Sequence, residues 1–445
     1  MEETIAEGRI PVGGLKRVIG RKVLVLFVIG DILGAGIYAL VGQVAGKVGG
    51  AIWVPFLAAF VLASLTATAY AELVGKYPKA AGAALYTNRA FRIPFLTFMV
   101  AFAVMMSGIT SASTVARAFG GRYLAEFVTL PVLVGALGFL AIVTLVNLAG
   151  ISESVKVNVV LTIIEAFGLL VIIAIGAWAL LQGDGDPGRA LEFHSSDGVF
   201  LGVMGGTALA FYALLGFEDS VNLAEEAKDP QRDFPRALFG GLAVTALIYL
   251  AVSFTATMLV DTRTLEQSTG PLLEVVKVAG VPFPPKLFAL IALLAVGNTA
   301  LINMIMASRL VYGMAREGII PPVFGVVHAR RATPWPAILF TVAIAVVLVS
   351  TGDIGGLADT TVLLLLLVFA LVNVCVLVLR REKVEHAHFR APTWMPALGA
   401  VVCLVLASPL TGRDAAVYAR AGILLAVGVV LWFLNHLVSR RRARA

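Results

Sequence analysis

Two stretches of this sequence place glycines and carboxyl groups inside apolar runs that are long enough to cross a membrane. The first reads GDILGAGIY from Gly30 to Tyr38, and the second reads FYALLGFEDS from Phe211 to Ser220. A charge at the bilayer midplane costs at least ~2.5–3.5 kcal/mol on insertion scales, and a glycine inside a helix costs ~1 kcal/mol relative to alanine. Both stretches therefore indicate membrane helices whose regular course is interrupted to form a binding site.

The small residues Gly34, Ala35 and Gly36 allow the backbone of the first stretch to unwind. Unwinding frees N–H and C=O groups that hydrocarbon cannot satisfy, so a ligand with its own donors and acceptors must satisfy them. N–H groups at the N-terminus of a half-helix suit a carboxylate, and freed carbonyls suit an ammonium group. A zwitterionic amino acid carries both groups. The alternative is that the glycines serve close packing between helices, but the matched pair of interrupted stretches favours the binding site.

The amino acid composition indicates the kind of structure that contains these two stretches. The chain has 445 residues, of which 59% are apolar and only 14% are charged, whereas soluble globular proteins carry about 25% charged residues. We therefore expect an all-α integral membrane protein, and the polar N-terminus does not resemble a cleavable signal. Apolar runs of about 20 residues predict twelve membrane helices, near residues 22–45, 51–75, 94–118, 129–150, 155–181, 198–223, 236–260, 285–313, 335–351, 355–379, 394–410 and 417–438.

The distribution of lysine and arginine predicts how these helices are oriented. With the N-terminus in the cytoplasm, 25 of the 34 basic residues fall in cytoplasmic segments. Both termini are therefore predicted to be cytoplasmic, with the chain in the cell membrane. The net charge of +7 follows from this asymmetry and favours the anionic inner leaflet of the lipid bilayer, so no nucleic-acid partner is expected.

Catalytic and metal-binding patterns are absent from the sequence. Cys375 and Cys403 lie in apolar stretches and are interpreted as small buried residues, while His386 and His388 alternate in a basic loop without a clear metal-ligand spacing. No glycine-rich nucleotide fingerprint occurs either. We therefore expect a protein that is not an enzyme and that binds neither a metal nor a cofactor.

Four sequence motifs, in the same order along the chain, resemble those of the amino acid–polyamine–organocation (APC) superfamily of amino acid permeases. GAGIY at 34–38 resembles its first-span signature, and GFE at 216–218, followed by AEEAKDPQRDFPRAL at 224–238, resembles its sixth span and the next loop. YPKAAGAALY at 77–86 resembles the loop after span 2, and SRLVYGMAREGIIPP at 308–322 resembles the end of span 8. These motifs are spread over about 300 residues of the chain, from Gly34 to Pro322.

The resemblance implies a specific architecture. It is a five-plus-five inverted repeat with discontinuous helices 1 and 6, like that of the leucine transporter, with two additional C-terminal helices. The implied segments are a cytoplasmic tail at 1–21, a first repeat at 22–181, a second repeat at 198–379, two further spans at 394–438 and a basic cytoplasmic tail at 439–445.

The resemblance also implies how a substrate would be held. Its carboxylate would meet the backbone N–H groups of Gly34, Ala35 and Gly36. Its ammonium group would meet backbone carbonyls, and Phe211 or Tyr212 would form an aromatic lid, although Tyr212 could instead be an ordinary packed side chain. The carbonyls are those of Ile32, Tyr212, Ala213 and Leu215.

Side-chain selectivity has only broad candidates in the sequence. They are polar or small residues near the middle of the third and eighth spans, and ordinary hydrogen bonding between helices is the favoured interpretation of each. These candidates are Ser107, Gly108, Ser111, Asn298, Thr299 and Asn303.

The fifth span departs from the family pattern. Many proton-coupled or sodium-independent relatives carry a lysine seven residues after the asparagine of an ES-x-(K/R)-x-N stretch. Here that stretch ends at Asn158, and the seventh residue after it is Glu165. Asp31, in the first span, is also unusual for the family. Two carboxyl groups that share a poorly hydrated site can hold a proton between them and release it, so we expect Asp31 and Glu165 to form a coupling or gating centre.

Other roles for these two acids stay open. They could bind sodium or the ammonium group of the substrate. Alternatively, Asp31 could cap the second half of the first helix, and Glu165 could bond to the unwound backbone.

These observations together predict a secondary active transporter that moves amino acids across the cytoplasmic membrane by alternating access. The expected coupling ion is the proton, with sodium as the alternative. A carrier of polyamines or other organic cations, or an amino acid exchanger, is the nearest alternative. A channel would need a continuous hydrated path, and it is less favoured, as is a sensor derived from a transporter.

Overall fold

The computed structural model describes residues 20–78, 82–150, 155–195, 198–221, 227–328, 331 and 333–442. Within these ranges the regular structure is helical, apart from isolated bridges such as the one between Gly49 and Phe193. The predicted all-α class is thus confirmed for the described part of the chain. Most of the predicted N-terminal tail, and the last three residues of the C-terminal tail, lie outside the described residues.

Eight of the described helices are long and apolar enough to cross a membrane. They are α3 (Trp53–Lys76), α5 (Pro94–Ala118, continued by the π-helical turn η1, Phe119–Tyr123), α6 (Val132–Ala149), α7 (Val155–Gln182), α9 (Pro230–Leu259), α12 (Pro285–Arg316), α14 (Ile354–Leu379) and α16 (Ala415–Arg442). The chain is therefore a multi-pass membrane protein.

The remaining predicted spans take two other forms. The first is a bent pair, α1 (Arg21–Ile32) and α2 (Gly36–Val48), whose axes differ by 44°. Three others are covered by shorter apolar helices, namely α8 (Val199–Ala213), α13 (Trp335–Thr351) and α15 (Trp394–Ala407).

Shorter elements occupy the connections. They are α4 (Gly82–Phe91), η2 (Pro187–Leu191), α10 (Thr262–Gln267), α11 (Pro271–Val278), η4 (Pro322–Gly325) and η5 (Pro409–Thr411). The connection between the predicted spans 236–260 and 285–313 is thus partly helical. Asp261 caps α10 by accepting a bond from the backbone N–H of Arg263, and Pro271 begins α11.

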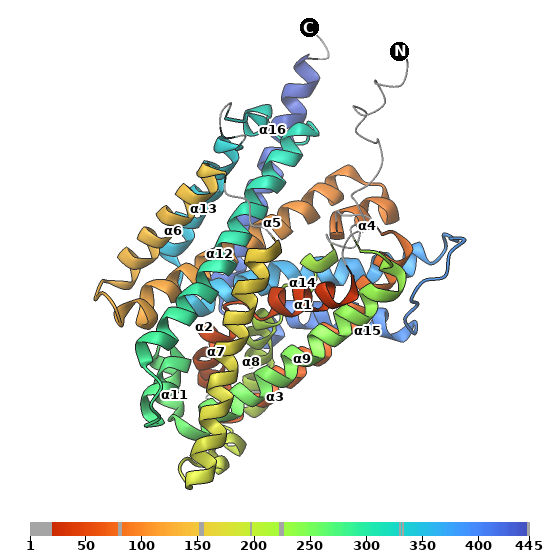
Figure 1. The fold of residues 1–445 in the computed structure, drawn as a ribbon. Coiled ribbons are helices and arrows are strands. Elements are labelled where there is room, and N and C mark those ends of the chain that lie inside the picture. The colour runs from red at the N-terminus through yellow and green to blue at the C-terminus, as the bar shows by residue number, and fades with distance from the viewer. Residues whose placement is uncertain are drawn as a thin grey trace, which may run out of the picture.

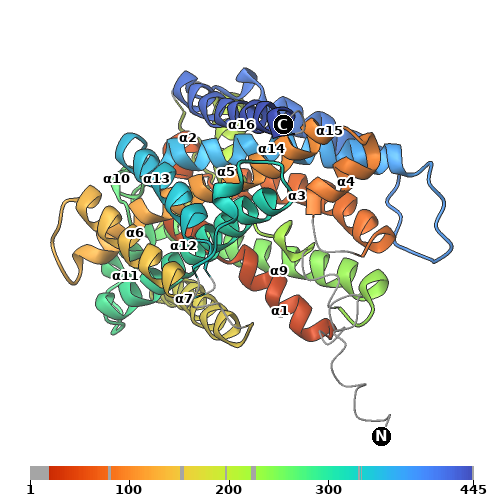
Figure 2. The same ribbon diagram turned by 90° about the horizontal axis from the view of Figure 1, so that it is seen from above.

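The helices pack in groups that bring distant parts of the chain together. α7 and α12 run side by side, while α6 packs against α13 beyond them (Figure 1). α1 and α3 both pack against α9, and α2 packs against α8. Seen from above, α15 and α16 lie along one edge of the molecule, away from α1 and α7 (Figure 2). The last two helices are therefore remote from α1, whereas η5 (Pro409–Thr411), which joins them, packs against α8.

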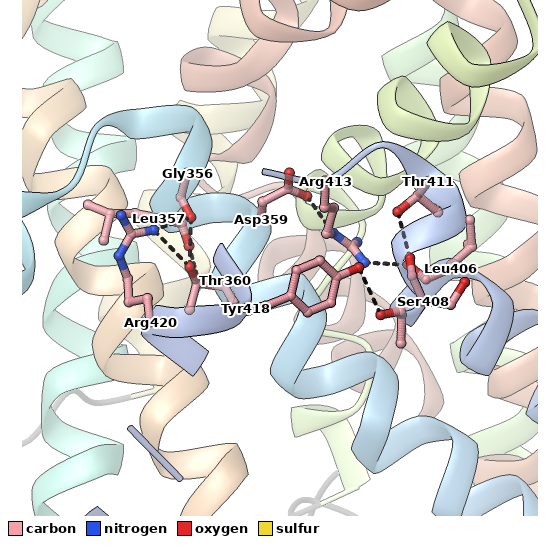
Figure 3. Close-up of polar contacts among 12 residues, drawn as sticks. Gly356, Leu357, Asp359, Thr360, Leu406, Ser408, Thr411, Arg413, Tyr418 and Arg420 are labelled. Carbon is pink, nitrogen blue, oxygen red and sulfur yellow. Dashed lines mark hydrogen bonds and ion pairs between the residues drawn. The ribbon is translucent and has the colours of Figure 1, made fainter. Parts of the chain in front are cut away.

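Two arginines fasten the C-terminal helices to the first turns of α14 (Figure 3). The buried guanidinium of Arg413 pairs with Asp359 at 3.1 Å and also donates to the carbonyl of Leu406. Arg420 donates to the carbonyl of Gly356 at 2.9 Å and to the hydroxyl of Thr360 at 3.0 Å. These contacts fix one end of α14 against α15, η5 and α16.

The opposite end of α14 is fixed by a third arginine. The guanidinium of Arg380 donates two bonds to the carboxylate of Glu72 in α3, at 2.7 and 2.6 Å. Glu72 also accepts the backbone N–H of Ala391 at 2.9 Å, and Arg380 donates to the hydroxyl of Thr393 at 2.8 Å. The ends of α3 and α14 and the start of α15 are thus joined by one hydrogen-bonded cluster.

Candidate functional site

The first interrupted span breaks where the sequence places its small residues. α1 ends at Ile32, the N–H of Leu33 closes the last turn on the carbonyl of Ile29 at 2.8 Å, and α2 begins at Gly36. A β-carbon on Gly36 would lie 2.5 Å from the Cα of Ala213 in α8. The glycine therefore serves close packing and also lies at the break, while its role in substrate binding stays a prediction.

The second interrupted span breaks after Ala213, where α8 ends. The N–H groups of Leu214 and Leu215 turn back to carbonyls one turn earlier, and Gly216 follows with φ of 117°. A β-carbon on Gly216 would clash with the carbonyl of Asp31, so glycine is needed here for both its conformation and its size. The carboxylate of Glu218 accepts the N–H of Gly216 at 2.9 Å. The two breaks therefore touch one another through their backbones.

One cavity of about 100 Å³ lies between the two breaks, which is enough for several water molecules. The structure brings all seven predicted substrate-binding residues to its wall, and their roles in binding stay predictions. These residues are Ile32, Gly34, Ala35, Gly36, Tyr212, Ala213 and Leu215.

α5 and α12 supply the polar side of the cavity. All six residues proposed from the third and eighth spans line it: Ser107, Gly108, Ser111, Asn298, Thr299 and Asn303. The hydroxyl groups of Ser111 and Tyr212 are 2.9 Å apart, and the side-chain amide of Asn303 donates to Ser111 at 3.2 Å. Hydrogen bonding between helices and a place on the cavity wall are thus combined in the same residues.

The two candidate lid residues occupy different places. Tyr212 lines the cavity, whereas Phe211 is fully buried and packs against Phe369 of α14, with ring centroids 6.0 Å apart. Phe211 is not among the residues of the cavity wall. Only Tyr212 therefore has the position that a lid requires.

The charged side chains on the cavity wall are all acidic. Asp31, Glu218 and Asp219 line it, and none of the described lining residues is lysine, arginine or histidine. The N-terminus of α2 also reaches the cavity, at Gly36, and its partial positive charge favours an anionic group. The lining therefore includes groups that favour an anion and groups that favour a cation.

Glu165 lies behind the wall that Asp31 lines. Its side chain is 1% exposed, and it accepts a bond from the side-chain amide of Asn298 at 3.4 Å. Gly30, next to Asp31, packs closely against Thr162, which precedes Glu165 by one helical turn. The structure thus places the two predicted coupling residues on adjacent segments, with Asn298 joining Glu165 to the cavity.

Two side chains bond to backbone groups of the first break. The hydroxyl of Tyr249, in α9, donates to the carbonyl of Ile32 at 2.7 Å, and the N–H of Ala35 donates to the hydroxyl of Thr299 at 3.1 Å. A carbonyl has two lone pairs, so Ile32 can still accept from a ligand. Sequence reasoning missed Tyr249, because a single tyrosine in an apolar helix carries no signal of its long-range partner.

The cavity extends away from α2. Its wall continues along α12 to Met306 and Leu310 and along α5 to Val104, while α2 contributes only Gly36. On the other side, α10 and α11 pack over α2, and Arg122 of η1 pairs with Glu274 of α11 at 3.1 Å. The described structure is therefore closed beyond α2.

The cysteines and histidines add no binding site to this part of the chain. Cys375 and Cys403 are both buried and free. No group of three or more metal-binding side chains occurs among the described residues.

Comparison with known proteins identifies the family to which this chain belongs. The family described as amino acid permease matches residues 19–433. A chloroplastic cationic amino acid transporter of Arabidopsis thaliana is 28% identical, over 94% of this chain and 76% of its own length. A branched-chain amino acid permease and a methylthioribose transporter, both of Bacillus subtilis, are each 26% identical, over 94% of this chain and 93% of their own lengths. Since the family match covers nearly the whole chain, the protein belongs to the amino acid permeases of the amino acid–polyamine–organocation superfamily.

Proposed function

We propose that this protein is a secondary active transporter that moves amino acids across the cytoplasmic membrane by alternating access. The observation that carries the proposal is the single cavity between two interrupted helices, lined by Gly34, Ala35 and Gly36 on one side and by Tyr212 and Ala213 on the other. Such a site suits a small ligand with one anionic and one cationic group. The amino acid transporters among its relatives agree with this substrate class.

Each end of the substrate has a place in this proposal. The carboxylate lies at the N-terminus of α2 against the backbone N–H groups of residues 34–36, where the helix dipole stabilises a negative charge. The ammonium group meets the carbonyl of Ile32 and those at the end of α8. Tyr212, held by Ser111, covers the bound substrate.

The architecture that we propose has twelve membrane helices. The bent pair and the three shorter apolar helices would complete the set begun by the eight long ones. Residues 22–181 and 198–379 would form the two inverted repeats, residues 394–438 the additional helices, and both termini would be cytoplasmic. In this orientation the cavity opens toward the cytoplasm.

Proton coupling is assigned to Asp31 and Glu165. Asp31 lines the cavity, and Glu165 is held behind it by Asn298. A proton shared between Asp31 and Glu165 would remove one of their two negative charges while substrate is bound. Sodium held by the same carboxylates is the alternative coupling ion.

A second candidate substrate class follows from the acidic wall. Asp31, Glu218 and Asp219 line the cavity without a basic residue among its described lining. This charge favours a substrate with an additional cationic group, such as a cationic amino acid or a polyamine. The chloroplastic relative is named as a cationic amino acid transporter.

Uptake into proteoliposomes tests the proposal. The purified full-length protein is reconstituted, and uptake of a labelled amino acid mixture is measured with an inward proton gradient, with a sodium gradient and with preloaded unlabelled amino acids. We expect saturable uptake driven by protons. Uptake only after preloading would identify an exchanger, and uptake of polyamines alone would replace amino acids as the substrate. The absence of saturable uptake of either class would refute the proposal.

A further inference from the structure

We propose that Thr299 is an internal competitor for the carboxylate of the substrate, an inference that rests on the proposed function. Its hydroxyl accepts the N–H of Ala35 at 3.1 Å. This N–H is one of the groups assigned to the substrate carboxylate. A bound amino acid must therefore displace the hydroxyl before it can use this donor.

The N-terminus of α2 receives a hydrogen-bond acceptor from another helix. The residue at its N-cap is Ala35, which has no side-chain oxygen, and no side-chain hydrogen bond caps the helix. Alanine is among the poorest N-cap residues. Thr299, from α12, accepts the N–H of Ala35 itself. Its hydroxyl oxygen thus lies where the proposed site would place an oxygen of the substrate carboxylate.

The hydroxyl proton of Thr299 is used within its own helix. Its hydroxyl lies 3.2 Å from the carbonyl of Ala295, one turn earlier, and donates to it. The single hydroxyl proton is therefore committed to α12, and the oxygen faces Ala35 as an acceptor. With its proton used in this way, Thr299 cannot donate to a carboxylate. It therefore competes with the substrate carboxylate for the N–H of Ala35.

The fit of Gly34 supports this role. A β-carbon on Gly34 would lie 2.8 Å from the hydroxyl oxygen of Thr299, so the hydroxyl reaches Ala35 only because residue 34 has no side chain. Thr299 also lines the cavity, which leaves room for its hydroxyl to turn aside. Threonine in a helix populates two χ1 rotamers, so this displacement needs no backbone movement.

The bond between Thr299 and Ala35 lowers the binding affinity for substrates that carry a carboxylate. A hydrogen bond to a charged acceptor is stronger than one to a hydroxyl, so the carboxylate prevails. The affinity for the amino acid is nevertheless reduced, because the hydrogen bond between Ala35 and Thr299 must first be broken. Removing the hydroxyl should tighten binding by about 2- to 12-fold, the equivalent of one neutral hydrogen bond. A substrate without a carboxylate should bind with unchanged affinity.

The experiment compares Thr299→Val, which keeps the branched shape without the hydroxyl, with Thr299→Ser, which keeps the hydroxyl. Equilibrium binding to the purified full-length protein is measured for leucine and arginine, and for isoamylamine and agmatine, which lack the carboxylate. We expect Thr299→Val to bind leucine or arginine, whichever the wild type binds, about 2- to 12-fold more tightly than the wild type. Thr299→Ser should bind it as tightly as the wild type does. The amines should show no such gain.

Several outcomes would overturn the inference. Unchanged or weaker amino acid binding by folded Thr299→Val would show that the hydroxyl does not compete, as would an equal gain for the amines. If Thr299→Val does not fold, Thr299→Ala removes the same hydroxyl and carries the same expectation. If the wild type binds neither leucine nor arginine, this inference fails together with the proposed amino acid site. Binding by the wild type without any effect of Thr299 refutes only the inference.

Discussion

Replacing Arg380 with glutamine tests the cluster that joins α14 to α3. The side chains of Glu72 and Arg380 are only 3% and 11% exposed, and two bonds of 2.6–2.7 Å connect them. Removing one partner of a buried ion pair costs about 3–5 kcal/mol, because the other charge stays buried without compensation. Each kcal/mol shifts the melting temperature by about 2–4 °C in chains of about 150–250 residues and by less in longer ones. We therefore expect a decrease of about 3–10 °C for Arg380→Gln.

The assay is the fraction of monodisperse protein that remains after heating in detergent, measured by size-exclusion chromatography. The bonds to Glu72 raise the pKa of Arg380 above its ordinary value, so its charge persists to high pH. The decrease should therefore be similar between about pH 6 and pH 8.

An exposed pair provides the matched control. Arg189 and Asp186 are 3.8 Å apart, with side chains 38% and 55% exposed, so Arg189→Gln should cost less than about 1 kcal/mol. The double variant Glu72→Leu/Arg380→Met removes both charges and should be more stable than Arg380→Gln alone. An equal effect of Arg380→Gln and Arg189→Gln would refute the reasoning.

Three further perturbations test other parts of the site. Gly216→Ala should destabilise the protein by about 1–3 kcal/mol through backbone strain alone, measured by the same heating assay, whereas Gly240→Ala in open space within α9 should be neutral or stabilising. Glu165→Gln and Asp31→Asn should each abolish stimulation of uptake by a proton gradient but leave exchange with preloaded substrate, and unchanged pH and sodium dependence in both would end the coupling hypothesis. Tyr249→Phe removes the bond to the end of α1 and should cost about 0.5–1.5 kcal/mol; no measurable loss of heat stability would show that this bond contributes little.

Local signals in the sequence predicted much of the site. Gly34 and Gly216 stand out because glycine is costly inside an apolar helix, and both lie at the observed breaks. Ser111 and Asn303 stand out in the same way, as polar residues in apolar spans, and both line the cavity.

Long-range packing determines what the sequence could not predict. Phe211 and Tyr212 are neighbours on one helix and equally suited to a lid, and the contact of Phe211 with Phe369 decides which one faces the cavity. The residue at which α8 ends also needs three-dimensional information, because the apolar pattern continues past Ala213, its last residue. Thr361 of α14 reaches the cavity from a nearly continuous apolar stretch, whose pattern gives no preferred face.

The contacts between the two breaks have a mechanical consequence. Gly36 rests on the backbone of Ala213, and Gly216 rests on the backbone of Asp31. Neither contact leaves room for a side chain, so a displacement of one break presses directly on the backbone of the other. Substrate that moves the first interrupted span must therefore also move the second.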